Sequence, residues 1–92
     1  MNNLDKEAVK IREAIERAIE AALEMGWAVA AASAIYTEAE FYKFLDDLHL
    51  TRDEARELIT LAAHRAKLSN EDRDRLLAIG INQTRRYLTG PS

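Results

Sequence analysis

The chain has 92 residues, of which 48% are hydrophobic and 32% charged, with a formal net charge of −3 and no cysteine. This length fits one domain with a single modest core. The lack of cysteine excludes disulfides, thiol nucleophiles and thiolate zinc sites, and three glycines with one proline are too few turn signals for a many-stranded β fold. We therefore expect an all-α protein with a single helical domain over residues 1–92.

The charges divide the chain into an acidic front and a basic tail. Residues 1–63 carry 7 basic and 13 acidic side chains, and residues 64–92 carry 6 basic and 3 acidic ones. A net charge of +3 in the tail is a small electrostatic footprint for nucleic acid. The N-terminal residues lack the features of a signal peptide, and the uncharged stretch 25–37 is shorter than the roughly 20 residues that cross a bilayer. We expect a soluble, cytoplasmic protein without membrane contact.

The first predicted helix runs from about residue 4 to 35. Its first half has one apolar face and one charged face, which is typical of a helix that packs on a core. Gly26 either ends this helix or lets a neighbouring backbone approach closely. The residues of the apolar face are Leu4, Ala8, Ile11, Ile15, Ala18, Ile19, Ala22 and Leu23.

The later part of this helix contains the segment MGWAVAAASAIYT, residues 25–37, which carries no charge on any side. Helices that are apolar all round are normally surrounded by other helices. We therefore interpret the segment as the centre of the bundle, enclosed by the shorter helices. The alternative is that part of it is exposed and forms an oligomer interface or a groove for a partner.

Three later segments share a helix-start pattern: YTEAEFYKFL, LTRDEARELI and LSNEDRDRLL. In each of them a Thr or Ser is followed three residues later by an acid, as in a capping box. The three cap pairs are Thr37 with Glu40, Thr51 with Glu54, and Ser69 with Asp72. They predict helices over about 37–48, 51–68 and 69–79.

The last part of the chain has two interpretations, which differ at Gly80. Gly80 closes the third of these helices and a short helix follows over 82–89, or one helix continues unbroken through Gly80. Either way the sequence predicts a compact four- to five-helix bundle with a long N-terminal helix.

Residues 68–90, LSNEDRDRLLAIGINQTRRYLTG, resemble the helix-turn-helix of phage-type repressors. Gly80 and Ile81 match the turn of that motif. The resemblance implies a small DNA-binding regulator that contacts DNA through Gln83, Arg85 and Arg86 at the start of the second helix. The chain departs from the family pattern at Leu76, where that family has a small residue.

The chain as a whole resembles computationally designed helical bundles. Helices rich in Glu, Lys, Arg and Ala, three capping boxes and short connections carry this resemblance. Gly26 and the two histidines depart from the designed repertoire and leave open a small natural regulator of phage or plasmid type.

Catalytic chemistry has two candidate side chains, His49 and His64. Neither has a second histidine at helical spacing, and a transition-metal site needs three or four converging ligands. We therefore predict no catalytic residue, no metal and no cofactor, and interpret both histidines as surface residues.

The remaining function is a non-catalytic scaffold or protein–protein interaction module that binds another protein or a second copy of itself. Aromatic side chains are common anchors at such interfaces, so Trp27, Tyr36 and Tyr42 are the candidate contact residues. Core packing is the alternative for Trp27 and Tyr36, whereas Tyr42 falls off the apolar face of its helix.

Overall fold

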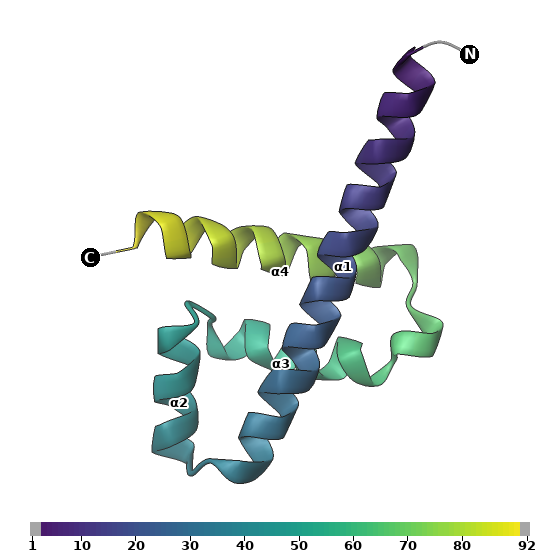
Figure 1. The fold of residues 1–92 in the computed structure, drawn as a ribbon. Coiled ribbons are helices and arrows are strands. Elements are labelled where there is room, and N and C mark those ends of the chain that lie inside the picture. The colour runs from purple at the N-terminus through teal and green to yellow at the C-terminus, as the bar shows by residue number, and fades with distance from the viewer. Residues whose placement is uncertain (1–2, 91–92) are drawn as a thin grey trace.

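The computed structural model describes residues 3–90, which form four α-helices and one short 3-10 helix (Figure 1). The α-helices are α1 (Asn3–Ile35), α2 (Glu38–Asp47), α3 (Arg52–Ala63) and α4 (Asn70–Thr89), and η1 (Arg65–Lys67) lies between the last two. No strand occurs within these 88 described positions. The predicted all-α class and the long N-terminal helix are confirmed.

The three predicted capping boxes are present at the starts of α2, α3 and α4. At α3, the Thr51 hydroxyl accepts a bond from the N–H of Glu54 at 3.0 Å, and the Glu54 carboxylate accepts one from the N–H of Thr51 at 3.0 Å. Each box satisfies backbone donors that the first turn of a helix leaves without an intrahelical partner. The starts of the three shorter helices are therefore encoded locally.

The core lies where the rear half of α1 packs on α3 and α4 (Figure 1). Both of these helices cross α1, and α2 lies beside its C-terminal end. The largest fully buried side chains come from all four α-helices: Leu23, Val29, Leu45, Leu58, Leu76 and Ile79.

Gly26 lies where the backbones of α1 and α3 approach closely. A Cβ atom at this position would lie 2.6 Å from the carbonyl oxygen of Leu58 and 2.9 Å from the Cβ of Ala62. α1 continues through Gly26. Because these distances leave no room for a side chain, the glycine is what allows the two backbones to approach so closely. Of the two interpretations of Gly26, the close approach is the one that the structure has.

The prediction that residues 25–37 are enclosed on all sides is wrong. Gly26, Val29 and Ala32 are buried, whereas Ala28, Ala31 and Ile35 on the other side are exposed, and Trp27, beside the end of α3, is partly exposed. The reason is that α3 and α4 both pack on the same side of α1, and α2 covers only its end (Figure 1).

The predicted helix over 51–68 is too long. α3 ends at Ala63, His64 follows as its C-terminal cap, and η1 then turns the chain towards α4. This turn allows Leu68 to pack against the core, and it leaves Ala66 exposed.

The two predicted segments 69–79 and 82–89 form one helix, α4, that runs through Gly80. Gly80 has no positive φ, so it does not adopt the left-handed conformation that ends a helix. A lone glycine costs a helix only about 1 kcal/mol, and buried Leu76 and Ile79 hold the first half of α4 in the core. Of the two interpretations of Gly80, the continuous helix is the one that the structure has, and the separate helices over 69–79 and 82–89 do not form.

Candidate interaction surface

The front half of α1 has an exposed surface on every side, since residues 4–18 are all exposed. A helix of 33 residues is about 50 Å long, whereas the 12 residues of α3 extend about 18 Å. The shorter helices therefore cover only the rear of α1, and its front projects beyond α4 (Figure 1).

Apolar residues of α1 recur at alternating intervals of four and three. We call this set the α1 stripe: Leu4, Ala8, Ile11, Ile15, Ala18, Ala22, Met25, Val29 and Ala32. Spacing of this kind over four heptads is the pattern of a helix that packs along another helix. Val29 and Ala32 are buried in the core, whereas Leu4 is 75%, Ile11 60% and Ile15 39% exposed. The front of the α1 stripe thus presents to solvent the same kind of surface that its rear buries.

A groove of about 590 Å³ lies where the α1 stripe meets α4. Ala18, Ala22 and Met25 line it from α1, and Leu77 and Ile81 are among the residues that line it from α4. Farther along α4 the groove includes Leu88, which is 76% exposed. An apolar surface therefore runs without interruption from the front of α1 into the angle between α1 and α4, and such surfaces mark interaction sites in soluble proteins.

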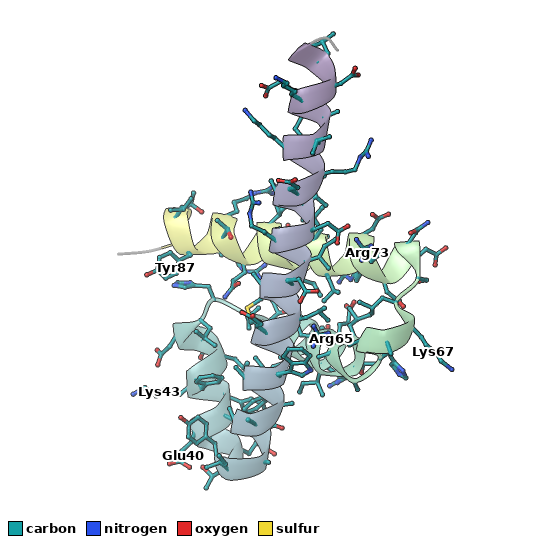
Figure 2. All side chains as sticks on the ribbon, turned by 45° about the vertical axis from the view of Figure 1, so that its right-hand side comes forward. Glu40, Lys43, Arg65, Lys67, Arg73 and Tyr87 are labelled. Carbon is teal, nitrogen blue, oxygen red and sulfur yellow. The ribbon has the colours of Figure 1, made fainter. Side chains whose placement is uncertain are left out.

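Trp27, a predicted contact residue for a partner, makes its contacts with other residues of the same chain. Its indole Nε1 donates a hydrogen bond to the carbonyl oxygen of Ala62 at 3.3 Å, near the end of α3, where helix carbonyls lack intrahelical partners. The guanidinium of Arg65 lies 4.8 Å from the ring centroid, and Arg65 also forms an ion pair with Glu20 at 3.6 Å. Figure 2 shows Arg65 alongside α1. These contacts give Trp27 a role in joining α1 to the end of α3.

Of the other two predicted aromatics, Tyr36 lies just before α2 and Tyr42 lies in the middle of it. The rings of Phe41 and Phe44 link the two. Tyr36 makes an edge-to-face contact with Phe44, with the ring centroids 5.6 Å apart. Tyr42 is half-buried against the core, and the guanidinium of Arg52 covers its ring at 3.6 Å. The structure therefore places Trp27, Tyr36 and Tyr42 at three separate helix junctions, and none of them lines the groove between α1 and α4.

Two of the three side chains predicted to contact DNA hold the connection between α2 and α3. Gln83 donates a hydrogen bond from Nε2 to the carbonyl oxygen of Leu48 at 2.8 Å. Arg86 donates one to the carbonyl oxygen of His49 at 2.9 Å and forms an ion pair with Glu54. Arg85 is exposed and lines the groove, and no ion pair of Arg85 occurs within residues 3–90.

The turn that carried the resemblance to repressors is absent. Gly80 and Ile81 lie in the middle of α4 and have helical backbone, whereas a helix-turn-helix needs two helices that meet at this point. A nucleic-acid contact by α4 would therefore use the side of one continuous helix.

The two histidines lie at the ends of helices. His49 follows α2 with a positive φ of 59°, and its ring contacts Tyr87 edge-to-face at 5.3 Å between centroids. Figure 2 shows Tyr87 near the end of α4. His64 caps α3 and is exposed. Over residues 3–90, no three His, Asp or Glu side chains converge in a group that would hold a metal ion.

By length and composition alone, the stretch Leu4–Ile35 of α1 would be able to cross a membrane, with a mean hydropathy of 1.3 over an 18-residue window. One third of that window is buried inside the protein, and the core helix of a soluble protein or a signal sequence passes the same test. This property of α1 is weak evidence for a membrane span.

Comparisons with protein-family models, with curated proteins and with solved structures give no match. They leave untested the resemblance to designed helical bundles, which stays a prediction.

Sequence reasoning assigned the α1 stripe to the core and so missed its front as a surface. The signal that identifies it is a comparison of lengths. Helices of about 12, 18 and 11 residues, laid across a helix of 32, cannot cover it from end to end at 1.5 Å per residue. Arg86 and Gln83 gave no comparable signal, because their partners lie 32 to 37 residues away in the sequence.

Proposed function

We propose that this protein is a non-catalytic interaction module whose binding surface is the front of the α1 stripe and the adjoining groove against α4. The observation that carries the proposal is the exposure of Leu4, Ile11 and Ile15 on a helix whose apolar spacing continues into the core. A partner on this surface would be another amphipathic helix, since helices that bury a stripe of four-three spacing pack along one another.

The helical state of residues 3–17 also supports a binding role. Helices of fewer than about 12–15 residues are marginally stable in water when no other element packs on them. The packed rear half of α1 supports the helical state of the front, because the two are one continuous helix. The apolar side chains of the front nevertheless remain in solvent. A bound helix would cover them and stabilise the helical form of this segment.

The charges around the stripe favour a protein helix over a lipid bilayer as the partner. Eight of the fifteen residues 3–17 are charged, four acidic and four basic. Each charged side chain placed at the centre of a bilayer costs about 2.5–3.5 kcal/mol on insertion scales. The mixed signs also differ from the Lys- and Arg-rich polar face that is typical of helices on anionic membrane surfaces.

The test is binding of a fluorescent helical peptide that has leucine at four-three spacing, measured by anisotropy at nanomolar protein concentration. We expect the wild-type protein to bind this peptide and the variant Ile11→Gln/Ile15→Gln to lose binding at least tenfold. Glutamine keeps helix propensity and net charge, and both sites lie outside the buried core, so the thermal midpoint should stay unchanged.

The matched control is Glu13→Gln/Arg17→Gln, which makes two glutamines on the opposite face and also keeps the net charge. We expect it to bind like the wild type. A wild-type protein that ignores the peptide but floats with vesicles of phosphatidylserine and phosphatidylcholine, and loses flotation in Ile11→Gln/Ile15→Gln, would overturn the proposal in favour of a membrane surface.

A further inference from the structure

The geometry points to a second copy of this chain as the helix that covers the front of the α1 stripe, with the two α1 helices antiparallel. This inference rests on the proposed function, because it names the partner of the same surface. Three observations carry it: the position of α4 along the stripe, the order of large and small residues, and the charges beside them.

The position of α4 excludes a parallel pair in the same register. Ala18, Ala22 and Met25 of the α1 stripe line a groove whose other wall is α4, so a helix that lies on the stripe and continues past Ala18 meets α4. In a parallel pair, each copy of α1 would continue through residues 19–35, with α3 and α4 attached, into this space. Figure 1 shows that the N-terminal part of α1 projects away from α4. In an antiparallel pair, the rear half of the second copy would therefore lie beyond this end of α1, away from α4 of the first copy.

The residues of the stripe define a register for the antiparallel pair. Placing Ala8 opposite Ile11 of the second copy also places Leu4 opposite Ile15, and twofold symmetry repeats both layers. The two outer layers then pair a large side chain with a large one, and the two inner layers pair a small residue with a large one, so that the facing side chains can interdigitate. Asn3 of the second copy lies level with Glu16, which forms an ion pair with Arg73 at the start of α4. The two α1 helices thus contact each other along the α1 stripe as far as α4 and no farther.

The charges next to the stripe agree with this register. Asp5 follows Leu4 and Arg12 follows Ile11, so both lie on the same edge of the stripe. In the antiparallel register, Asp5 of one copy lies across from Arg12 of the other, and the symmetry makes two such pairs. Opposite charges at flanking positions of paired helices favour the register that brings them together.

The first part of the experiment is the molar mass of the wild-type protein by light scattering after size exclusion, from micromolar to millimolar concentration and at low and high salt. The monomer has a mass of 10.4 kDa. We expect the mass to rise to twice this value with concentration and to do so at high salt, because apolar contacts persist where screened charges do not. Ile11→Gln/Ile15→Gln should remain monomeric, and Glu13→Gln/Arg17→Gln should behave like the wild type.

The second part determines the orientation by disulfide trapping, which the lack of native cysteine makes unambiguous. A mixture of the variants Leu4→Cys and Ile15→Cys should form the mixed disulfide under mild oxidation. Leu4→Cys alone should not cross-link, because position 4 of one copy lies about 16 Å from position 4 of the other along the antiparallel helices, beyond the reach of a disulfide. Leu4→Cys mixed with Glu13→Cys, which faces away from the stripe, controls for random collision.

Two results would overturn the inference. Efficient cross-linking of Leu4→Cys with itself would show a parallel pair. A monomer at every concentration would exclude the second copy as the partner, while retained binding of the helical peptide would leave the proposed function standing. Loss of both association and peptide binding would reject the proposed function as well.

Discussion

Arg86 of α4 donates a hydrogen bond from Nε to the carbonyl oxygen of His49, 2.9 Å away and 37 residues earlier in the chain. His49 has a φ of 59°, a conformation that costs energy for a residue other than glycine. The same guanidinium bonds to the carboxylate of Glu54, which also accepts the N–H of Thr51 in the α3 capping box. One side chain of α4 therefore holds the connection between α2 and α3 and the start of α3.

We expect Arg86→Ala to destabilise the protein by about 1–3 kcal/mol, because it removes hydrogen bonds to a carbonyl and to a carboxylate. It also leaves Glu54, which is 7% exposed, as a buried carboxylate without its cation. Urea unfolding followed by circular dichroism measures the difference. Arg85→Ala is the matched control, and its effect should stay within about 0.5 kcal/mol, as for most surface substitutions. Equal effects at the two positions would contradict the assigned role of Arg86.

Comparing variants of Arg85 and Arg86 also separates nucleic-acid binding from an effect on the fold. Loss of binding in Arg86→Ala would be ambiguous, since that variant disturbs the fold. Arg85 keeps its side chain on the surface, so Arg85→Ala tests the contact alone. If α4 binds DNA, affinity for a duplex at low salt should fall in Arg85→Ala and should fall steeply with added salt in the wild type. No binding by the wild-type protein at low salt would reject the hypothesis.

Substitution by alanine is expected to have opposite effects on stability at Gly80 and at Gly26. Gly80 lies in the middle of α4 with nothing within 4 Å of an added Cβ, so Gly80→Ala should stabilise the protein by up to about 1 kcal/mol through helix propensity. For a chain of this size, that shift raises the thermal midpoint by about 4–8 °C. Differential scanning calorimetry measures it directly, and a lower midpoint would mean that α4 needs the glycine.

Gly26→Ala gains the same helix propensity but should lower the thermal midpoint. Its Cβ would lie 2.6 Å from the backbone oxygen of Leu58, so α1 and α3 would have to move apart in the core. Overpacking of this kind costs about 1–3 kcal/mol, which exceeds the gain. A stabilised Gly26→Ala variant would show that the α1–α3 crossing is looser than the structure has it.

The local parts of the fold could be predicted from the sequence. The cap pairs Thr37–Glu40, Thr51–Glu54 and Ser69–Asp72 involve residues three apart, and all three form as expected. The long first helix could also be predicted from its run of helix-forming residues, whereas the sequence left open whether Gly26 ends it.

The parts that depend on tertiary packing could not be predicted. Whether Gly80 ends a helix depends on what holds the residues on either side of it, and Gln83 and Arg86 find their partners on another element. Whether Ile11 is buried depends on how far α3 and α4 reach along α1. The sequence contains the apolar pattern of the candidate site, but only the arrangement of the helices separates its buried half from its exposed half.

The ion pair between Glu57 of α3 and Arg75 of α4 predicts how stability depends on pH. Arg75 donates from Nε and Nη2 to the two carboxylate oxygens, at 2.5 and 2.7 Å, and this bond holds the pKa of Glu57 below its ordinary value of 4.5. The unfolded chain therefore takes up the proton at higher pH than the folded protein does. The stabilisation by this pair is complete above about pH 5 and is lost as the pH falls through the folded pKa.

Glu57→Gln should remove this dependence. Because solvent reaches both side chains, which are 46% and 39% exposed, we expect the variant to be less stable than the wild type by at most about 1 kcal/mol near neutral pH. The difference should stay constant from pH 8 to 5 and shrink below pH 4.5, as the wild-type carboxylate becomes protonated. Urea unfolding at stepped pH measures it, with Glu13→Gln as the control at an exposed carboxylate of α1 that forms no ion pair within residues 3–90. A difference that grows towards acid pH would have the opposite sign and would show that the bond to Arg75 does not stabilise the charged form of Glu57 in solution.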